Sequence, residues 1–285
     1  TTTSAGDIDF EFFMNDWYHY FVAPFKVRII NCATFDVHRT SNEASPTELD
    51  NYTTGSFIVS QPLTGDNNPL GGTISNCKFS RPNSSLGSHA IVFTGCANYT
   101  FNNVQAGVLE YARKNGAVLF QLCRNLTFND CITYAASLTF ATTSNVTINN
   151  LTYIDRLIGV TIPNDGKYAF VCGTSCDNII VNGLLLGSTA DLAPYAGLFN
   201  ATNSSNLTFR NVGSFAAPVD VNSAFAPAYI FDDGGNNDGV RVQRIYVEAT
   251  RNAPSRTRNT SKNITFENVQ GTNGSQVTLS VNTAA

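Results

Sequence analysis

Charged side chains are scarce in this sequence. Asp, Glu, Lys and Arg make up 13% of the 285 residues, which is about half the share of an ordinary soluble domain. The formal net charge is −4, and no run of Lys or Arg occurs. This charge pattern argues against nucleic acid and against insertion into or binding to an anionic membrane.

Several other features that would point to a function class are missing. The chain has three His, one Met and one Trp, and its seven Cys show no zinc-site spacing, so we expect no metal and no cofactor. No apolar stretch approaches the roughly 20 residues of a membrane-spanning helix. The sequence starts at Thr1 without Met or a signal-peptide pattern, so we expect a processed chain or a fragment.

The sequence contains many near-copies of one short motif. Residues 125–131 read Asn-Leu-Thr-Phe-Asn-Asp-Cys, and similar strings begin at Asn98, Asn145, Asn206 and Asn263. Weaker copies begin at positions 26, 71, 178 and 239. The nine copies have a mean spacing of (263 − 26)/8, about 30 residues, and a repeat of this length is typical of a solenoid.

Aligned with one another, the copies show a fixed pattern of apolar and polar positions. The fourth position is always large and apolar, and the second nearly always apolar, so each copy predicts a strand with one buried face. The sixth position is mostly Asn, which indicates a bend with left-handed backbone and amides that bond those of adjacent copies. The next position is again apolar, so a second strand leaves the bend. The fourth-position residues are Ile29, Ile74, Phe101, Phe128, Ile148, Val181, Phe209, Val242 and Phe266.

A Phe precedes most copies by five to eight residues and predicts a third strand. Three short strands per repeat form one coil, and nine coils stacked at about 4.8 Å give a rod of about 40 Å. The Phe residues of this third strand are expected to form one buried column. They are Phe93, Phe120, Phe140, Phe170, Phe199 and Phe231.

This pattern resembles the right-handed parallel β-helix of the pectate-lyase-like superfamily, which includes polysaccharide lyases, polygalacturonases and phage tailspikes. The resemblance covers residues 26 to about 280. It implies an all-β, single-stranded right-handed parallel β-helix of about nine coils over 26–285. Residues 1–25 are expected to form an N-terminal cap, either a helix or a packed strand, because a solenoid must close its end. The alternative for this aromatic segment is a platform that stacks on carbohydrate.

Three longer connections interrupt the regular spacing. Residues 40–69 are either a protruding loop or a degenerate coil around 57–59. The extra residues 154–167 and 213–227 are expected to emerge on one face, which in solenoids is often the binding face. After Val269 only one further strand, 276–281, is readable, so we expect the chain to continue, to meet a partner or to assemble with copies of itself.

Apolar residues also flank the Phe positions and are expected to point outward. A row of them on the outside of a rod must be covered. The cover is either homotrimer packing, as in viral spikes, or a capping helix or returning loop. The residues are Val92, Leu119, Leu198 and Ile230.

The cysteines occupy repeat positions. Cys32, Cys77 and Cys131 share one column, and Cys96, Cys123 and Cys176 each precede an Asn of the repeat by two residues. Neighbours one coil apart are within disulfide range, but buried thiols that fill a stack explain the same positions. The reduced state is favoured, and Cys172 to Cys176 is the expected bridge if one forms.

Asp232, Asp233 and Asp238 are the candidate catalytic residues. A glycoside hydrolase needs two carboxylates about 5 to 10 Å apart, and residues 232–238 hold the richest acidic stretch. Asp-Asp-Gly-Gly is also a turn sequence. The candidate substrate-binding residues are Glu110 and Arg113, in one charged turn, and Asp155 and Asp165, in or just before an insertion. The alternative for the charged turn is that it is simply solvated.

The motifs of the enzymatic relatives are absent. Polygalacturonases carry Gly-Asp-Asp, Gly-His-Gly and Arg-Ile-Lys, and the nearest strings here are residues 231–233 and 244–246. The leading hypothesis is therefore a virion tailspike or tail-fibre component, a homotrimer that binds host surface polysaccharide, with depolymerisation left open. The alternative is a secreted, extracellular polysaccharide hydrolase or lyase that acts as a monomer, and a passive adhesin is a third reading.

Overall fold

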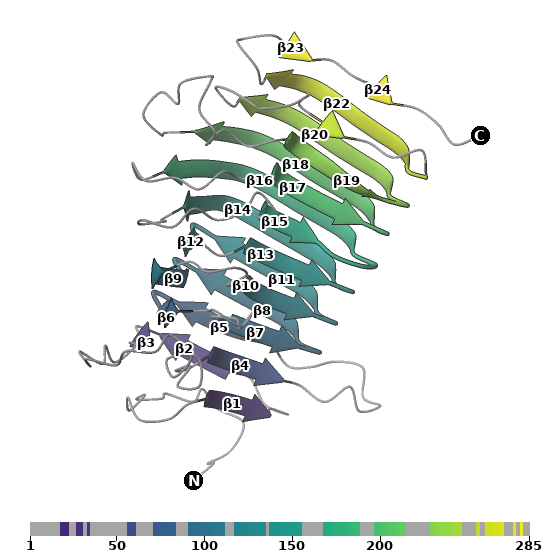
Figure 1. The fold of residues 1–285 in the computed structure, drawn as a ribbon. Helices are drawn as coiled ribbons and strands as arrows, with labels where there is room; N and C mark the ends of the chain where they lie inside the picture. The colour runs from purple at the N-terminus through teal and green to yellow at the C-terminus, as the bar shows by residue number, and fades with distance from the viewer. Residues whose placement is uncertain are drawn as a thin grey trace, which may run out of the picture.

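The computed structural model is an elongated stack of short β-strands (Figure 1). It describes residues 18–22, 27–30, 33–34, 56–60, 71–83, 91–111, 117–134, 137–155, 168–188, 197–214, 229–246, 255–256, 260–270, 276–277 and 280–281. Every element within these ranges is a strand. No helix among them is long and apolar enough to cross a membrane.

The strands form two sheets. The first has nine strands, all parallel, in the order β1-β4-β7-β10-β13-β15-β17-β19-β21. Their bounds are β1 Tyr18–Val22, β4 Ser56–Ser60, β7 Ile91–Thr94, β10 Ala117–Gln121, β13 Ser137–Ala141, β15 Tyr168–Cys172, β17 Gly197–Thr202, β19 Tyr229–Gly235 and β21 Ser255–Arg256.

The second sheet has fifteen strands, and its main path is β2-β5-β8-β11-β14-β16-β18-β20-β22-β23. The bounds on this path are β2 Val27–Ile30, β5 Gly72–Ser75, β8 Ala97–Asn102, β11 Arg124–Asn129, β14 Ser144–Asp155, β16 Asp177–Ser188, β18 Ser205–Ser214, β20 Asp238–Tyr246, β22 Lys262–Gln270 and β23 Gln276–Val277. Beside it lie β3 Ala33–Thr34, β6 Lys78–Asn83, β9 Gln105–Tyr111, β12 Ile132–Tyr134 and β24 Ser280–Val281. All its pairs are parallel except those of β22 with β23 and β24.

Strands that are neighbours in a sheet come from successive repeats, and this is the arrangement of a parallel β-helix (Figure 1). The register confirms the nine aligned copies: the fourth-position residues Ile29, Ile74, Phe101, Phe128, Ile148, Val181, Phe209, Val242 and Phe266 are paired in that order. Burial alternates along the described strands, as in β8 and β11. The period-two pattern therefore placed each strand in the correct register.

The structure describes part of the N-terminal segment and part of residues 40–69, for which the sequence allowed alternatives. Of the predicted N-terminal cap, Tyr18–Val22 forms β1 at the end of the first sheet. Of residues 40–69, Ser56–Ser60 forms β4 between β1 and β7, which favours the degenerate coil around 57–59. Of the extra residues 154–167 and 213–227, the first two of each end β14 and β18, and the others lie outside the described residues.

The bends use left-handed backbone, as the Asn residues predicted. The sixth position has positive φ at Asn76, Asn103, Asp130, Asn150, Gly183, Asn211, Arg244 and Asn268. The first position of the repeat does the same at Asn98, Asn125, Asn145, Asn178, Asn206 and Asn263, and a third column does so at Leu122, Thr142, Ser175, Asn203 and Asn236. The left-handed backbone was expected only at the sixth position. Asn is favoured because it tolerates this conformation better than other residues with a Cβ.

The core is one continuous stack of aromatic and aliphatic side chains. Phe101 and Phe128 are stacked with ring centroids 4.6 Å apart. Phe120 packs edge-on against both, at 5.3 and 5.0 Å. Offset-stacked and edge-to-face pairs are the favourable arrangements of aromatic rings, so successive coils hold one another in register.

The prediction of a single Phe column on the first sheet is wrong. Phe93, Phe120 and Phe140 are paired in register, but Phe140 is opposite Cys172, and that column continues to Ala201 and Asp233. Phe170, Phe199 and Phe231 form a second column, which is continued in earlier coils by Leu138, Val118 and Ile91. The cause is a changed spacing, because Phe140 precedes Asn145 by five residues and Phe170 precedes Asn178 by eight.

The predicted apolar strip is also divided by this register. Val92 and Leu119 are neighbours, but their column continues to Thr139, Val171, Asn200 and Asp232, which is mostly polar in the later coils. Ile230 is two residues before Asp232 on β19, so it is not in this column, and it is fully buried, whereas Leu119 is half-buried. The four residues therefore do not form one row.

Replacing Asn125 by Ala should lower the free energy of unfolding by about 2 kcal/mol. A residue with a Cβ costs about 1–2 kcal/mol in the left-handed region, where Asn125 has φ 55°, and its side-chain bonds to Asn98 and Asn145 are lost. Asn125→Gly loses the bonds alone, so we expect a smaller decrease. Urea denaturation of the three proteins measures both, and an equal loss in the two variants would contradict the role of the backbone.

Candidate functional site

The outward face of the second sheet carries three parallel rows of polar side chains. On β8, β11 and β14 the residues alternate between buried apolar and outward polar. The first row is Asn98, Asn125, Asn145, Asn178 and Asn206; the second is Thr100, Thr127, Thr147 and Thr208, interrupted by Ile180; the third is Asn102, Asn129, Asn149 and Asn182. The first row is exposed, and the other two are half-buried.

Hydrogen bonds between side chains hold the Asn rows in place. In the first row Asn125 Nδ2 donates to Asn98 Oδ1 at 2.9 Å, and the bonds from Asn145 and Asn178 to the preceding residue measure 3.2 and 2.9 Å. In the third row Asn129 and Asn149 donate likewise at 2.9 and 3.0 Å. The two Asn rows therefore present amide groups in a preorganised array, with the Thr row between them. The side-chain amides of these Asn residues are thus used within the fold.

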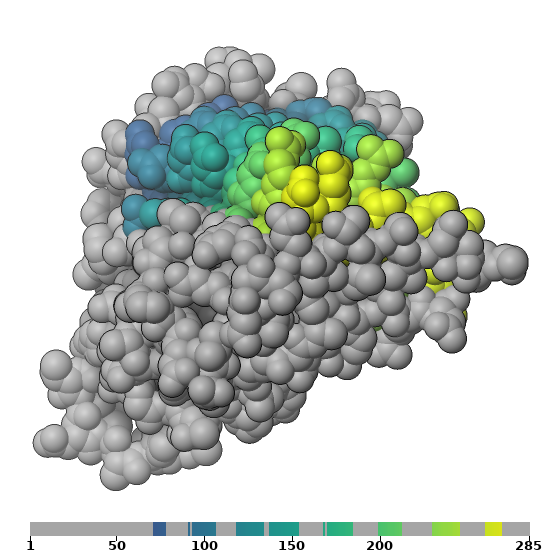
Figure 2. Space-filling model, turned by 90° about the horizontal axis from the view of Figure 1, so that it is seen from above, coloured from purple at the N-terminus to yellow at the C-terminus, as the bar shows by residue number. Residues whose placement is uncertain are grey.

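The character of this face changes toward the C-terminal coils. From β18 to β22 charged side chains become frequent, namely Arg210, Asp238, Arg241, Arg244, Lys262 and Glu267, whereas on β8 to β16 Arg124 and Asp177 flank the three neutral rows. In the space-filling view from above (Figure 2), the described residues form a surface on which the chain order runs from blue to yellow. The face therefore has a neutral part and a charged part.

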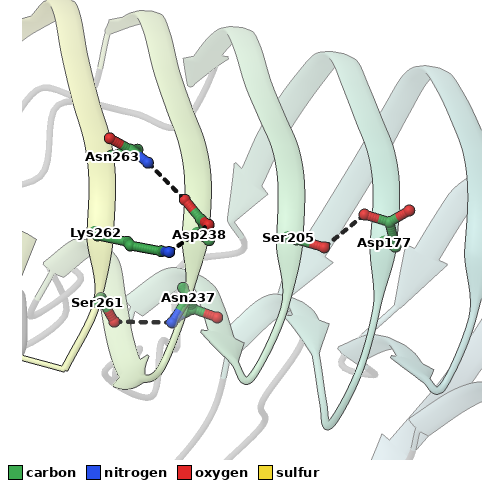
Figure 3. Close-up of polar contacts among 7 residues, drawn as sticks. All are labelled: Asp177, Ser205, Asn237, Asp238, Ser261, Lys262 and Asn263. Atoms are coloured by element: carbon green, nitrogen blue, oxygen red, sulfur yellow. Dashed lines mark hydrogen bonds and ion pairs between the residues drawn. The ribbon is translucent and has the colours of Figure 1, made fainter.

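Two carboxylates of this sheet, one on β16 and one on β20, are bound by the next coil (Figure 3). Asp177 Oδ1 accepts from Ser205 Oγ at 2.5 Å and from Asn206 Nδ2 at 2.9 Å, and these bonds lower the pKa of its carboxyl below the ordinary value. Asp238 accepts from Asn263 at 2.7 Å and pairs with Lys262 Nζ at 3.2 Å. These contacts lower the pKa of Asp238 as well.

Asp233 lies inside the coil and not on this face. It is 0% exposed, because its column is that of Phe140, Cys172 and Ala201. Its Oδ1 accepts from Ser261 Oγ at 2.8 Å, Asn237 Nδ2 at 2.6 Å and the Gly235 amide at 2.8 Å. A carboxylate with several donors is a stable anchor for a bend.

Asp232 is also buried, with 2% of its surface exposed. The Tyr168 hydroxyl donates to Asp232 Oδ2, and Asn200 Nδ2 donates to the Asp232 carbonyl at 3.0 Å. Asp238, in contrast, is 43% exposed. The three predicted catalytic carboxylates therefore do not share one open cleft in this structure, and their catalytic role stays a prediction.

Two of the four predicted substrate-binding residues lie on described strands. Glu110 belongs to β9, and Asp155 is the last residue of β14, opposite Ser188. Arg113 and Asp165 lie outside the described residues. The substrate-binding role of these four residues stays a prediction.

A buried polar column was missed by the sequence reasoning. Cys123, Thr143, Cys176, Ser204, Asn237 and Ser261 occupy equivalent places two residues before the first position of each repeat. Ser204 Oγ donates to the Gly173 carbonyl at 3.0 Å and accepts from the Cys176 amide at 3.2 Å. In the same way, Thr143 Oγ1 donates to the Phe120 carbonyl and accepts from the Cys123 amide. The sequence signal for this column is that Cys, Thr and Ser recur two residues before the first position of the repeat, where only the cysteines had been noticed.

All six cysteines in the described part of the chain are buried, and none of them is in a disulfide. Burial raises the pKa of Cys172, whereas a hydrogen bond from Cys172 lowers the pKa of Cys176. Burial raises the pKa of Cys131 to about 11. The favoured reading of reduced, stack-filling thiols is confirmed for these six residues. Cys32 lies outside the described residues.

Within the described ranges, no group of three or more His, Cys, Asp or Glu is placed to hold a metal ion. Comparison of the chain with protein-family models, with curated proteins and with solved structures finds no match.

Proposed function

We propose that this protein is a component of a virion tailspike or tail fibre that binds polysaccharide on the host surface. In this proposal it is a right-handed, pectate-lyase-like β-helix of about nine coils with an N-terminal cap, and it works as a homotrimer. The observation that carries the binding function is the set of three neutral polar rows on β8, β11, β14 and β16. The whole chain is turn-rich and short of charge, as suits a stable extended binding rod.

The chemistry of the face fits sugar rings. Hydroxyl and amide groups both donate and accept hydrogen bonds, and the bonds along the Asn rows fix their positions before a ligand arrives. Preorganisation reduces the entropy that binding costs. A linear glycan can meet the same groups in each successive coil, because the rows repeat at the strand spacing of about 4.8 Å.

Binding of purified host surface polysaccharides, measured by calorimetry, tests this proposal. Thr127 is flanked in register by Thr100 and Thr147, so Thr127→Lys places a long side chain in the middle of the face. We expect it to weaken binding at least about tenfold, equivalent to 1.4 kcal/mol. Thr139→Lys, on the first sheet and equally half-buried, is the matched control and should leave binding unchanged.

Two further measurements concern the oligomeric state of the protein and its ability to cleave the glycan. Light scattering should give a trimer, and release of reducing ends from the bound glycan should be insensitive to Asp238→Asn. A monomer whose glycan cleavage depends on Asp238 would favour the secreted hydrolase or lyase instead. Binding that Thr127→Lys and Thr139→Lys affect equally would overturn the assignment of the face.

A further inference from the structure

We propose that the charged end of the polar face, at Arg210 of β18 and Arg241 of β20, is a subsite for the carboxylate groups of acidic sugars. This inference rests on the proposed function, and it names the chemistry of one part of the ligand. The partner is a glycan that carries carboxylates, bound partly on the neutral rows and partly at these two guanidinium groups.

The register places the two arginines beside each other on one face. Arg241 is opposite Thr208, and Arg210 is opposite Gln243. Both are outward positions, since the neighbouring residues Phe209, Val240 and Val242 are buried. The two Cα atoms are diagonal neighbours, about 8 Å apart for strands 4.8 Å apart with a rise of 3.3 Å per residue. One short stretch of glycan can thus contact both.

The carboxylates of the same end are already bound elsewhere. Asp238 is held by Lys262 and Asn263 (Figure 3). Glu267 accepts a hydrogen bond from Gln243 at 2.8 Å. Among the residues that the structure describes, no carboxylate lies within ion-pair distance of Arg210 or Arg241. Their positive charge is therefore available to an external anion.

Arg210 has a second feature that points to a ligand. Its Nε is buried from solvent and has no hydrogen-bond partner within the described part of the protein. A buried donor without an acceptor is costly, so the side chain gains when it turns its Nε–Nη edge toward an oxyanion. The planar fork of Arg matches the two oxygens of a carboxylate. Arg244, exposed at the adjacent bend, adds to the positive field.

The experiment uses two matched oligosaccharides and the full chain. The probe is a hexasaccharide of alternating glucuronate and N-acetylglucosamine, and its carboxyl-reduced form is the neutral counterpart. We expect the acidic form to bind at least about tenfold more tightly, and the double variant Arg210→Gln/Arg241→Gln to abolish this difference, because charge-assisted bonds are the stronger ones. Arg256→Gln, on β21 of the first sheet, should keep it.

Two further measurements keep the outcomes distinct. Arg210→Lys/Arg241→Lys keeps the charge but loses the fork, so an intermediate affinity supports carboxylate recognition, and full affinity overturns it in favour of a charge effect alone. A single-stranded oligonucleotide of equal charge should bind more weakly than the hexasaccharide, and tighter binding would overturn the proposal. If the neutral form binds as well as the acidic one, this inference fails while the proposed function stands. If purified host polysaccharides also fail to bind, the proposed function fails together with this inference.

Discussion

Replacing Phe120 by Ala should lower the free energy of unfolding by about 3–5 kcal/mol, the usual cost of a large cavity in a packed core. Phe120 is 1% exposed and contacts Phe93, Phe101, Phe128 and Phe140, with ring centroids 5.0 to 5.4 Å away. It therefore joins three coils. Removing it takes ring contacts from each of them, and no neighbour on the same strand can replace these.

Chemical denaturation followed by near-ultraviolet circular dichroism measures this effect. Phe120→Leu keeps most of the volume and should cost clearly less than Phe120→Ala. Thr127→Ala, which removes an outward side chain of the neighbouring strand β11, should have a small effect. A loss for Phe120→Ala no larger than that for Thr127→Ala would mean that the aromatic stack does not hold the coils together.

Replacing Asp233 by Ala should lower the free energy of unfolding by about 3 kcal/mol, because each buried donor left without an acceptor costs about 1–3 kcal/mol. The donors are Ser261 Oγ, Asn237 Nδ2 and the Gly235 amide. They come from two successive coils, so the loss loosens both the bend and its contact with the next coil.

The matched variants separate a structural role for Asp233 from a catalytic one. Asp233→Asn keeps an oxygen in the same place and should be destabilised less than Asp233→Ala. Asp238→Asn, at the surface, should leave stability nearly unchanged. A folded Asp233→Asn protein that has lost glycan cleavage shown by the natural sequence would support the catalytic prediction and contradict a purely structural role.

The repeat itself could be predicted because its signals are local. Alternation of apolar residues at the second and fourth positions specifies a strand and its buried face in every copy, and Asn at the sixth position specifies the bend. Each copy carries this information independently, so weak copies such as those at Gly71 and Gly239 were still aligned correctly. The left-handed conformation at Asn125 and its equivalents escaped prediction, because the same Asn residues were read only as the start of a strand.

The register of the first sheet could not be predicted from the Phe residues. Cys172 precedes Asn178 by six residues, whereas Phe140 precedes Asn145 by five, and a bulge follows at Ala201 and Thr202. Such single-residue changes move a whole strand by one or two positions, and a shift of one residue reverses the faces of a strand. This is why Asp233 is inside the coil although its sequence reads as an exposed turn.

The sequence by itself determined that this chain forms stacked coils of parallel strands with a polar outer face, because those properties repeat in every copy and need no information from other parts of the chain. The tertiary structure decided which carboxylates are buried and which arginines lie together. These depend on the register between coils, and that register is set by how Phe, Cys and Ala side chains fill the core, which no single repeat specifies.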